Sequence, residues 1–187
     1  MLTGLEQYSL ERAGYFIRRA AISDDLLVAG EIVRILEAVL PTMRSALSGP
    51  LRYYRGTVVG QVWSRGFPIP WDVPVGEQLS ALARTAEHLQ ARINTAADES
   101  LVLLPGTHAA APSPEDAAAL AANRDPPGMV RVRLCPGDAL FWNTNVIHRN
   151  TRDMQGGICV TCVSQNIHAP PCAWMGEPLE MPSKEIA

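Results

Sequence analysis

The chain has 187 residues, of which 47% are apolar and 19% charged, and its formal net charge is −3. This composition is ordinary for a globular protein and gives enough residues for one domain with a core. Lysine and arginine form no block, which argues against nucleic acid as the main partner because phosphate binding needs clustered cations. No apolar run approaches the ~20 residues of a membrane span, and the first residues are polar and mixed in charge. We therefore expect no membrane span and a cytoplasmic location.

The first 50 residues predict helices around one short strand. Residues 5–13 read as a helix and residues 14–18 as a strand. Ser23 is a good N-cap for a second helix, whose apolar residues between 26 and 40 recur at close to the helical repeat. Pro41 follows, and because proline breaks helix interiors we expect the helix to end there.

The rest of the chain predicts short strands separated by turns. A helix-like stretch at 76–88 and a helix that begins at Ser113-Pro114 interrupt them, and the segment from 169 onward reads as an extended tail. Helices followed by many short strands predict antiparallel sheets with helices packed outside. The expected strands lie at 51–63, 89–93, 100–104, 129–134, 139–142 and 158–164.

Four cysteines are too few for a disulfide scaffold in a chain of this length. Cys159 and Cys162 have the spacing of a CxxC motif but stand in a strand-like run. Because residues three apart on a strand point to opposite faces, we interpret them as separate thiols rather than as a metal or redox pair.

Three segments of the chain carry motifs that are best considered together. Residues 100–108 end in Pro-Gly-Thr-His and precede the helix start at Ser113, while residues 136–149 contain Pro-Gly-Asp-Ala-Leu-Phe-Trp-Asn and then Ile-His-Arg. The opening strand at 14–17 and the helix after Ser23 form the third match. Together these segments resemble the phytanoyl-CoA dioxygenase family. The resemblance implies a mainly β fold with flanking helices, the double-stranded β-helix (a cupin-like jelly roll). We expect a single domain over 1–187, with a helical part at 1–50, the jelly-roll core at 51–165 and the tail at 169–187.

The family resemblance implies Fe(II) and 2-oxoglutarate, with iron held by two histidines and one carboxylate. The first histidine and the carboxylate belong to an H-x-D motif, and His148 matches the second histidine. In Trp63-Ser64-Arg65-Gly66, Ser64 and Gly66 stand at the lost ligand positions, and none of the four histidines begins H-x-D or H-x-E. The arginine that the family places after the second histidine, to pair with 2-oxoglutarate, is also missing. From this we expect no metal and no cofactor.

Five further assignments concern a pocket. His148 is a candidate residual ligand or acid–base residue, and Asp72 is a candidate rebuilt carboxylate, although a loop aspartate is more often a turn former. Trp63, His108 and Trp142 are expected to line the pocket, with core packing as the alternative for the aromatic residues.

Three functions follow from these expectations. The first is a non-catalytic subunit that stabilises or completes a catalytic Fe(II)/2-oxoglutarate dioxygenase paralogue in secondary metabolism, with a homodimer as the other assembly. The second is a metal-independent isomerase or cyclase that binds a hydrophobic small molecule and uses His148 as acid or base. The third is an active dioxygenase with rebuilt ligands.

Overall fold

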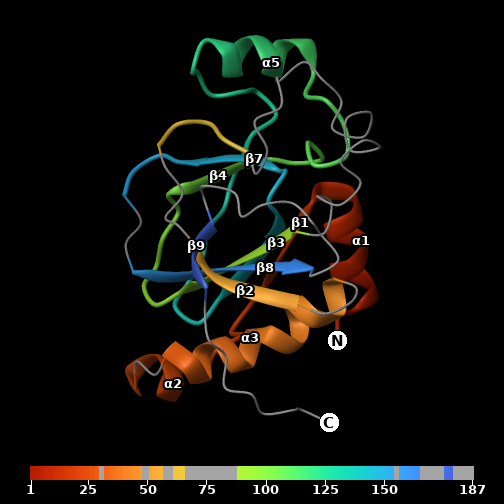
Figure 1. Ribbon diagram of the computed structural model, residues 1–187. Helices are drawn as coiled ribbons and strands as arrows, with labels where there is room; N and C mark the ends of the chain where they lie inside the picture. Colours follow the sequence, from red (N-terminus) through yellow and green to blue (C-terminus); the bar gives the residue numbers. More distant parts are fainter. Residues whose placement is uncertain are drawn as a thin grey trace.

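The computed structural model describes residues 1–29, 32–47, 51–56, 61–65, 88–153, 156–164 and 175–178, and for residues 32, 51–56, 88, 161–164 and 175–178 it gives the backbone path alone (Figure 1). Short strands follow an N-terminal group of helices, as the sequence pattern predicts. The elements are α1 (Gly4–Ala13), β1 (Tyr15–Arg18), α2 (Asp24–Ala29), α3 (Ile32–Ala46), β2 (Leu51–Gly56), β3 (His88–Asn94), β4 (Leu101–Leu104), α5 (Pro114–Ala121), β5 (Val130–Arg131), β6 (Ala139–Asn143), β7 (Ile147–Asn150), β8 (Gly157–Ser164) and β9 (Met175–Pro178).

The strands form two antiparallel sheets. The larger sheet has the order β1-β6-β3-β8-β2-β9, and the smaller sheet has the order β5-β4-β7. Every strand pair in the described part of the chain is antiparallel. Figure 1 shows α2 and α3 beside the larger sheet and α5 at the opposite end, beyond β7. The protein is therefore mainly antiparallel sheet with a few helices.

Helix α3 does not end at Pro41, contrary to the expectation from the sequence. It continues to Ala46 with the proline inside it. Five side chains on one face of this helix are buried against the larger sheet, and such packing can outweigh the cost of about 3 kcal/mol that an interior proline imposes. They are Ile35, Leu36, Val39, Leu40 and Met43.

The larger sheet buries both of its faces. One face packs against α3 through a cluster that includes Phe16, Ala91, Phe141 and Val160, with the Phe16 and Phe141 rings stacked 4.9 Å apart. The other face meets the smaller sheet through a second cluster, which contains Leu140 and Trp142 of β6 and Leu101 and Leu103 of β4. The interior between the two sheets is thus the place where a pocket of this fold can form.

Three parts of the strand layout differ from the expectation. Residues 147–150 form β7, which is not among the expected strands. His88 opens β3 rather than ending a helix, and the stretch 66–87 that precedes it lies outside the described residues. Strand β9 pairs with β2 in the segment expected to be an unpaired tail.

No helix in the described ranges is both long enough and apolar enough to cross a membrane.

Candidate functional site

Strand β3 places polar side chains in the interior between the sheets. Its residues alternate, and Leu89, Ala91 and Ile93 belong to the apolar cluster on the α3 side. Because successive side chains of a strand point to opposite faces, the intervening residues project toward the smaller sheet. These interior residues are Gln90, Arg92 and Asn94, and all three are buried.

Arg92 belongs to a buried polar network, which we call the Arg92 cluster (Arg92, Asn94, Asp98 and Ser100), and Asp98 also lies 3.9 Å from the exposed Arg152. Arg92 Nη2 donates to Asp98 Oδ2 in an ion pair whose side chains are each 1% exposed, and Arg92 Nε donates to Asn94 Oδ1 at 2.9 Å. Ser100 Oγ donates to the same Asp98 oxygen at 2.6 Å. Burial acts to raise the pKa of Asp98, but the hydrogen bonds from Ser100 and the charge of Arg92 outweigh it and lower that pKa. The cluster therefore stays ionised and fixes the turn after β3.

Ser64 and His148 are direct partners across an isolated antiparallel bridge. Each backbone N–H donates to the other residue's carbonyl oxygen at 2.9 Å. Side chains of directly opposed residues share a face of the sheet, and the register of His148 with Leu103 places that face in the interior. The imidazole of His148 therefore has a serine side chain beside it where a second ligand of a metal centre could stand.

The His148 imidazole is held in one tautomer. Its Nδ1 lies 2.6 Å from the carbonyl oxygen of Val146, and because a carbonyl can only accept, Nδ1 carries the hydrogen. Burial lowers the pKa of His148, which favours the neutral ring with an unprotonated Nε2. This arrangement gives Nε2 a free lone pair that can accept a hydrogen bond or bind a metal ion.

Trp142 contacts the same imidazole. The two rings meet edge to face, with centroids 5.9 Å apart, and Trp142 is fully buried on the neighbouring sheet. We call Ser64, Trp142 and His148 the His148 site. The structure thus brings two of the predicted site residues, Trp142 and His148, into contact and places Ser64 beside them.

The remaining predicted pocket residues lie elsewhere. Trp63 packs into the cluster on the outer face of the smaller sheet, near Leu120 of α5, and its Nε1 donates to the carbonyl of Arg124 at 3.1 Å. Trp63 and Ser64 thus point to opposite faces. Arg149 also lies on the outer side, with its guanidinium 4.9 Å from the centre of the Trp63 ring.

His108 fastens α1 to the turn after β4. Its Nε2 lies 3.1 Å from the carbonyl oxygen of Glu11, so Nε2 donates and the buried Nδ1 has no hydrogen-bond partner in the structure. The ring packs on Gly14, which has φ +81°, and a Cβ there would lie 2.5 Å from His108 Nδ1. Burial lowers the pKa of His108. The residue holds the end of a helix in place.

Asp72 and Gly66 lie outside the described residues, so the structure places neither of them. Cys159 is buried on β8 beside Arg92, and burial raises the pKa of its thiol to about 11, which makes it a poor nucleophile or metal ligand.

The metal centre that the resemblance implies fits this interior in part. His148 Nε2 is oriented as a metal ligand should be, with the other ring nitrogen bound to a carbonyl. Ser64 offers a neutral hydroxyl, a weak donor. Within the described segments no group of three His, Cys, Asp or Glu residues could hold a metal ion.

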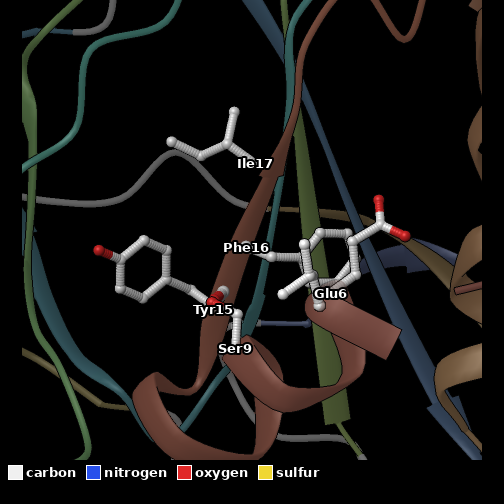
Figure 2. A pocket seen from close by; sticks show the side chains of 6 residues that line it. Glu6, Ser9, Tyr15, Phe16 and Ile17 are labelled. Atoms are coloured by element: carbon white, nitrogen blue, oxygen red, sulfur yellow. The ribbon is translucent and has the colours of Figure 1, made fainter. Parts of the chain in front are cut away.

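A separate hollow of about 260 Å³ lies between α1 and β1. Figure 2 shows Glu6 and Ser9 of α1 next to Phe16, with Tyr15 and Ile17 pointing away from them. Its polar groups are engaged: Glu6 pairs with Arg18, which lowers the pKa of Glu6 to about 2, and Ser9 Oγ donates to the Tyr15 carbonyl at 2.7 Å. The polar side chains of Glu6 and Ser9 are therefore already engaged within the protein and are not free to bind a ligand.

Sequence reasoning missed the polar face of β3. The signal was present, because His-Leu-Gln-Ala-Arg-Ile-Asn alternates polar and apolar residues with a period of two. In a strand buried on both faces, that pattern puts polar groups into the interior.

No protein-family model matches the chain, and no curated protein matches it. The resemblance to the phytanoyl-CoA dioxygenase family thus rests on the sequence segments alone.

Solved structures, in contrast, are similar over nearly the whole chain. HygX from Streptomyces hygroscopicus with iron bound is 12% identical with a TM-score of 0.59, covering 95% of this chain and 97% of HygX. AviO1 from Streptomyces viridochromogenes Tue57 is 15% identical with a TM-score of 0.55, covering 92% and 100%. EctD from S. alaskensis, with 2-oxoglutarate and 5-hydroxyectoine, is 14% identical with a TM-score of 0.54, covering 96% and 86%. The chain therefore shares its fold with these three proteins, of which HygX was solved with iron and EctD with 2-oxoglutarate.

These structures correct one expectation. Because two ligand positions are lost, we expected no cofactor. That expectation is wrong, since proteins of this fold bind metal ions and 2-oxoglutarate. HygX holds iron in one structure and nickel with 2-oxoglutarate in another, and EctD holds 2-oxoglutarate. The missing motifs therefore do not justify the expectation that no cofactor binds.

Proposed function

We propose that this chain is an accessory subunit of a catalytic dioxygenase of the same fold. It would bind an intact paralogue and stabilise it or complete its active site, in a secondary-metabolite pathway. We further propose that the two sheets form the double-stranded β-helix of the phytanoyl-CoA dioxygenase family, as a single domain over residues 1–187.

The observation that carries the proposal is the bridge between Ser64 and His148. The fold retains one anchored imidazole, but the residue directly opposite it on the interior face is a serine. Such a chain keeps the scaffold and one ligand position, but the neighbouring position carries only a weak donor. It is therefore suited to support a reaction that another chain catalyses. The similarity to solved dioxygenases over nearly the full length supports a retained scaffold.

Co-expression with an intact paralogue tests this proposal. We expect the two chains to elute together in size-exclusion chromatography with light scattering, and the paralogue to melt at a higher temperature in the complex. The matched control is the paralogue with an unrelated protein of similar size. A paralogue that neither binds the chain nor gains stability would contradict the accessory role.

A second candidate is a dioxygenase in its own right, and the anchored His148 favours it. The hydrogen bond from Nδ1 to Val146 leaves Nε2 directed for a metal ion. The other ligands would come from beyond the described residues, where Asp72 is the sequence candidate. Titration with Mn(II) and 2-oxoglutarate tests this reading: stoichiometric binding that is lost in His148→Ala supports it, and binding that persists in that variant excludes His148 as the ligand.

A further inference from the structure

The turn after β4 carries a buried hydroxyl group that is bonded on both sides. Thr107 is 3% exposed, and its Oγ1 donates to the Leu104 carbonyl at 2.7 Å. The same oxygen accepts from the backbone N–H of Ile147 at 2.9 Å. A hydroxyl has one hydrogen to donate and two lone pairs to accept with, so both bonds can form together. Thr107 therefore joins the end of β4 to the start of β7 through its side chain.

The N–H that Thr107 binds belongs to the same peptide unit as the carbonyl that holds His148. That unit lies between Val146 and Ile147, and its carbonyl oxygen is 2.6 Å from His148 Nδ1. The unit is trans, as are all peptide bonds in the described part of the chain, and a peptide unit is planar. Its N–H and C=O consequently point in opposite directions in one plane. A hydrogen bond that fixes the first also fixes the second.

The side chain of Val146 keeps this peptide unit from shifting. Val146 is fully buried and lies against Gly14, where a Cβ would come within 2.4 Å of Val146 Cγ2. The backbone N–H of Val146 donates to the Asn143 carbonyl at 3.0 Å. The remaining freedom of the unit is rotation of its plane, and the hydrogen bond to Thr107 restrains that rotation.

We propose that Thr107 is a positioning residue for the His148 imidazole. Its hydroxyl sets the plane of the peptide unit whose carbonyl holds the hydrogen on Nδ1, and this leaves Nε2 as the ring nitrogen without a hydrogen. Three hydrogen bonds thus run in series from the Leu104 carbonyl to the imidazole, and bonds in series strengthen one another. The inference goes beyond the accessory role and does not depend on it, because it concerns the chain without a metal or a partner.

Long-range ¹H–¹⁵N correlation spectra test the proposal, because they report which ring nitrogen carries the hydrogen. We would record them on the full chain labelled with ¹⁵N-histidine, at about pH 8, where an ordinary histidine is neutral, and with EDTA to remove metal ions. His148→Gln identifies the His148 signals among those of the four histidines. We expect one tautomer, with the hydrogen on Nδ1. A hydrogen on Nε2, or an equal mixture of tautomers, in the wild-type chain would overturn the proposal.

Substitutions at Thr107 separate the hydroxyl from the shape of the side chain. Thr107→Val keeps the shape but cannot accept from Ile147, so the ratio of the Nδ1–H to the Nε2–H tautomer should fall about fivefold, as the loss of one neutral hydrogen bond predicts. Thr107→Ser keeps the hydroxyl and should retain the wild-type ratio. Thr107→Cys, whose sulfur accepts only weakly, should lower the ratio less than valine does, and it carries the test if Thr107→Val does not fold. A wild-type ratio in the cysteine and valine variants would overturn the proposal.

Thr151→Val is the matched control, because Thr151 makes a similar contact just beyond the other end of β7. Its Oγ1 donates to the Ser100 carbonyl at 3.1 Å, next to the start of β4. Its loss also removes a hydrogen bond between these two strands, but it leaves the peptide unit that holds His148 untouched. The tautomer ratio should therefore stay at the wild-type value. An equal fall in both valine variants would show a general loosening of the sheet and would overturn the specific role of Thr107.

Discussion

Two polar groups of residues share the interior between the sheets, and they differ in how well they are satisfied. In the Arg92 cluster, the charges of Arg92 and Asp98 are balanced and further bonded to Asn94 and Ser100. In the His148 site, the Trp142 donor has no partner and Ser64 contributes one long hydrogen bond of 3.4 Å to the His148 carbonyl. Satisfied buried polar groups rigidify a fold, whereas an unsatisfied one costs stability and is retained where strain, a water molecule or a function accounts for it. The first group is therefore structural and the second is the candidate for function.

The largest effect should follow from breaking the Arg92 cluster. Asp98→Asn leaves the Arg92 charge buried without its counterion, which typically costs about 3–5 kcal/mol of unfolding free energy. Urea unfolding followed by circular dichroism measures the loss. Glu99→Gln is the control, because Glu99 pairs with Arg133 at the exposed surface and its loss should cost less than about 1 kcal/mol. Equal effects of the two substitutions would refute the distinction.

A substitution at Ser64 should instead create a metal-binding pair with His148. Ser64→His places a second imidazole opposite His148 on the same face, and two such rings can chelate Ni(II). We expect Ni(II) affinity to rise at least about tenfold over the wild-type chain, measured by isothermal titration. Ser64→His combined with His148→Ala is the control and should lose the gain. No gain in the single variant would mean that the two side chains do not share a face.

A smaller effect concerns His108 and the pH dependence of stability. Burial lowers its pKa in the folded chain below the ordinary value for histidine of about 6.5, so the unfolded chain binds more protons than the folded chain as the pH falls below that value. The contribution of His108 to stability is therefore complete above about pH 6.5 and declines as the pH falls toward the folded pKa. His108→Gln keeps a donor for the Glu11 carbonyl but does not titrate, so its stability should vary less between pH 7 and pH 5. If the denaturant midpoint of His108→Gln changed with pH as much as that of the wild-type chain, His108 would be excluded as a source of the pH dependence.

The smallest effect should come from Ser64→Ala. The Ser64 side chain makes one long hydrogen bond, and its backbone bonds to His148 do not need the hydroxyl. We expect the unfolding free energy to change by less than about 0.5 kcal/mol, because little is lost with a single long hydrogen bond. A loss comparable to that of Asp98→Asn would place Ser64 in a structural network and remove the contrast between the two groups.

Much of the fold could be predicted from local patterns. The Ser113 cap and the apolar run at 139–142 act within a few residues, and the elements they predict are present. The helix through Pro41 could not be foreseen, because the buried face that sustains it depends on a sheet formed by distant residues. The pairing of β9 with β2 joins segments more than 100 residues apart, and no local signal encodes it.

The candidate site could be predicted in part for the same reason. His148 was singled out by its motif and lies in the interior, while the opposition of Ser64 to His148 is a tertiary relation that no local pattern predicts. Trp63 was expected in the pocket, but strand alternation turns it to the outer face beside α5. The Arg92 cluster was missed because its four residues form no recognisable sequence motif. They come into contact only when β3 and the turn that follows it are folded.

Turnover by an intact paralogue, measured with and without this chain, tests the accessory role most directly. The account predicts that the isolated chain consumes no 2-oxoglutarate under conditions where the paralogue does, and that adding one equivalent of the chain raises the paralogue's rate or extends its active lifetime. A paralogue with full activity and lifetime alone, or an isolated chain that consumes 2-oxoglutarate at a comparable rate, would contradict it.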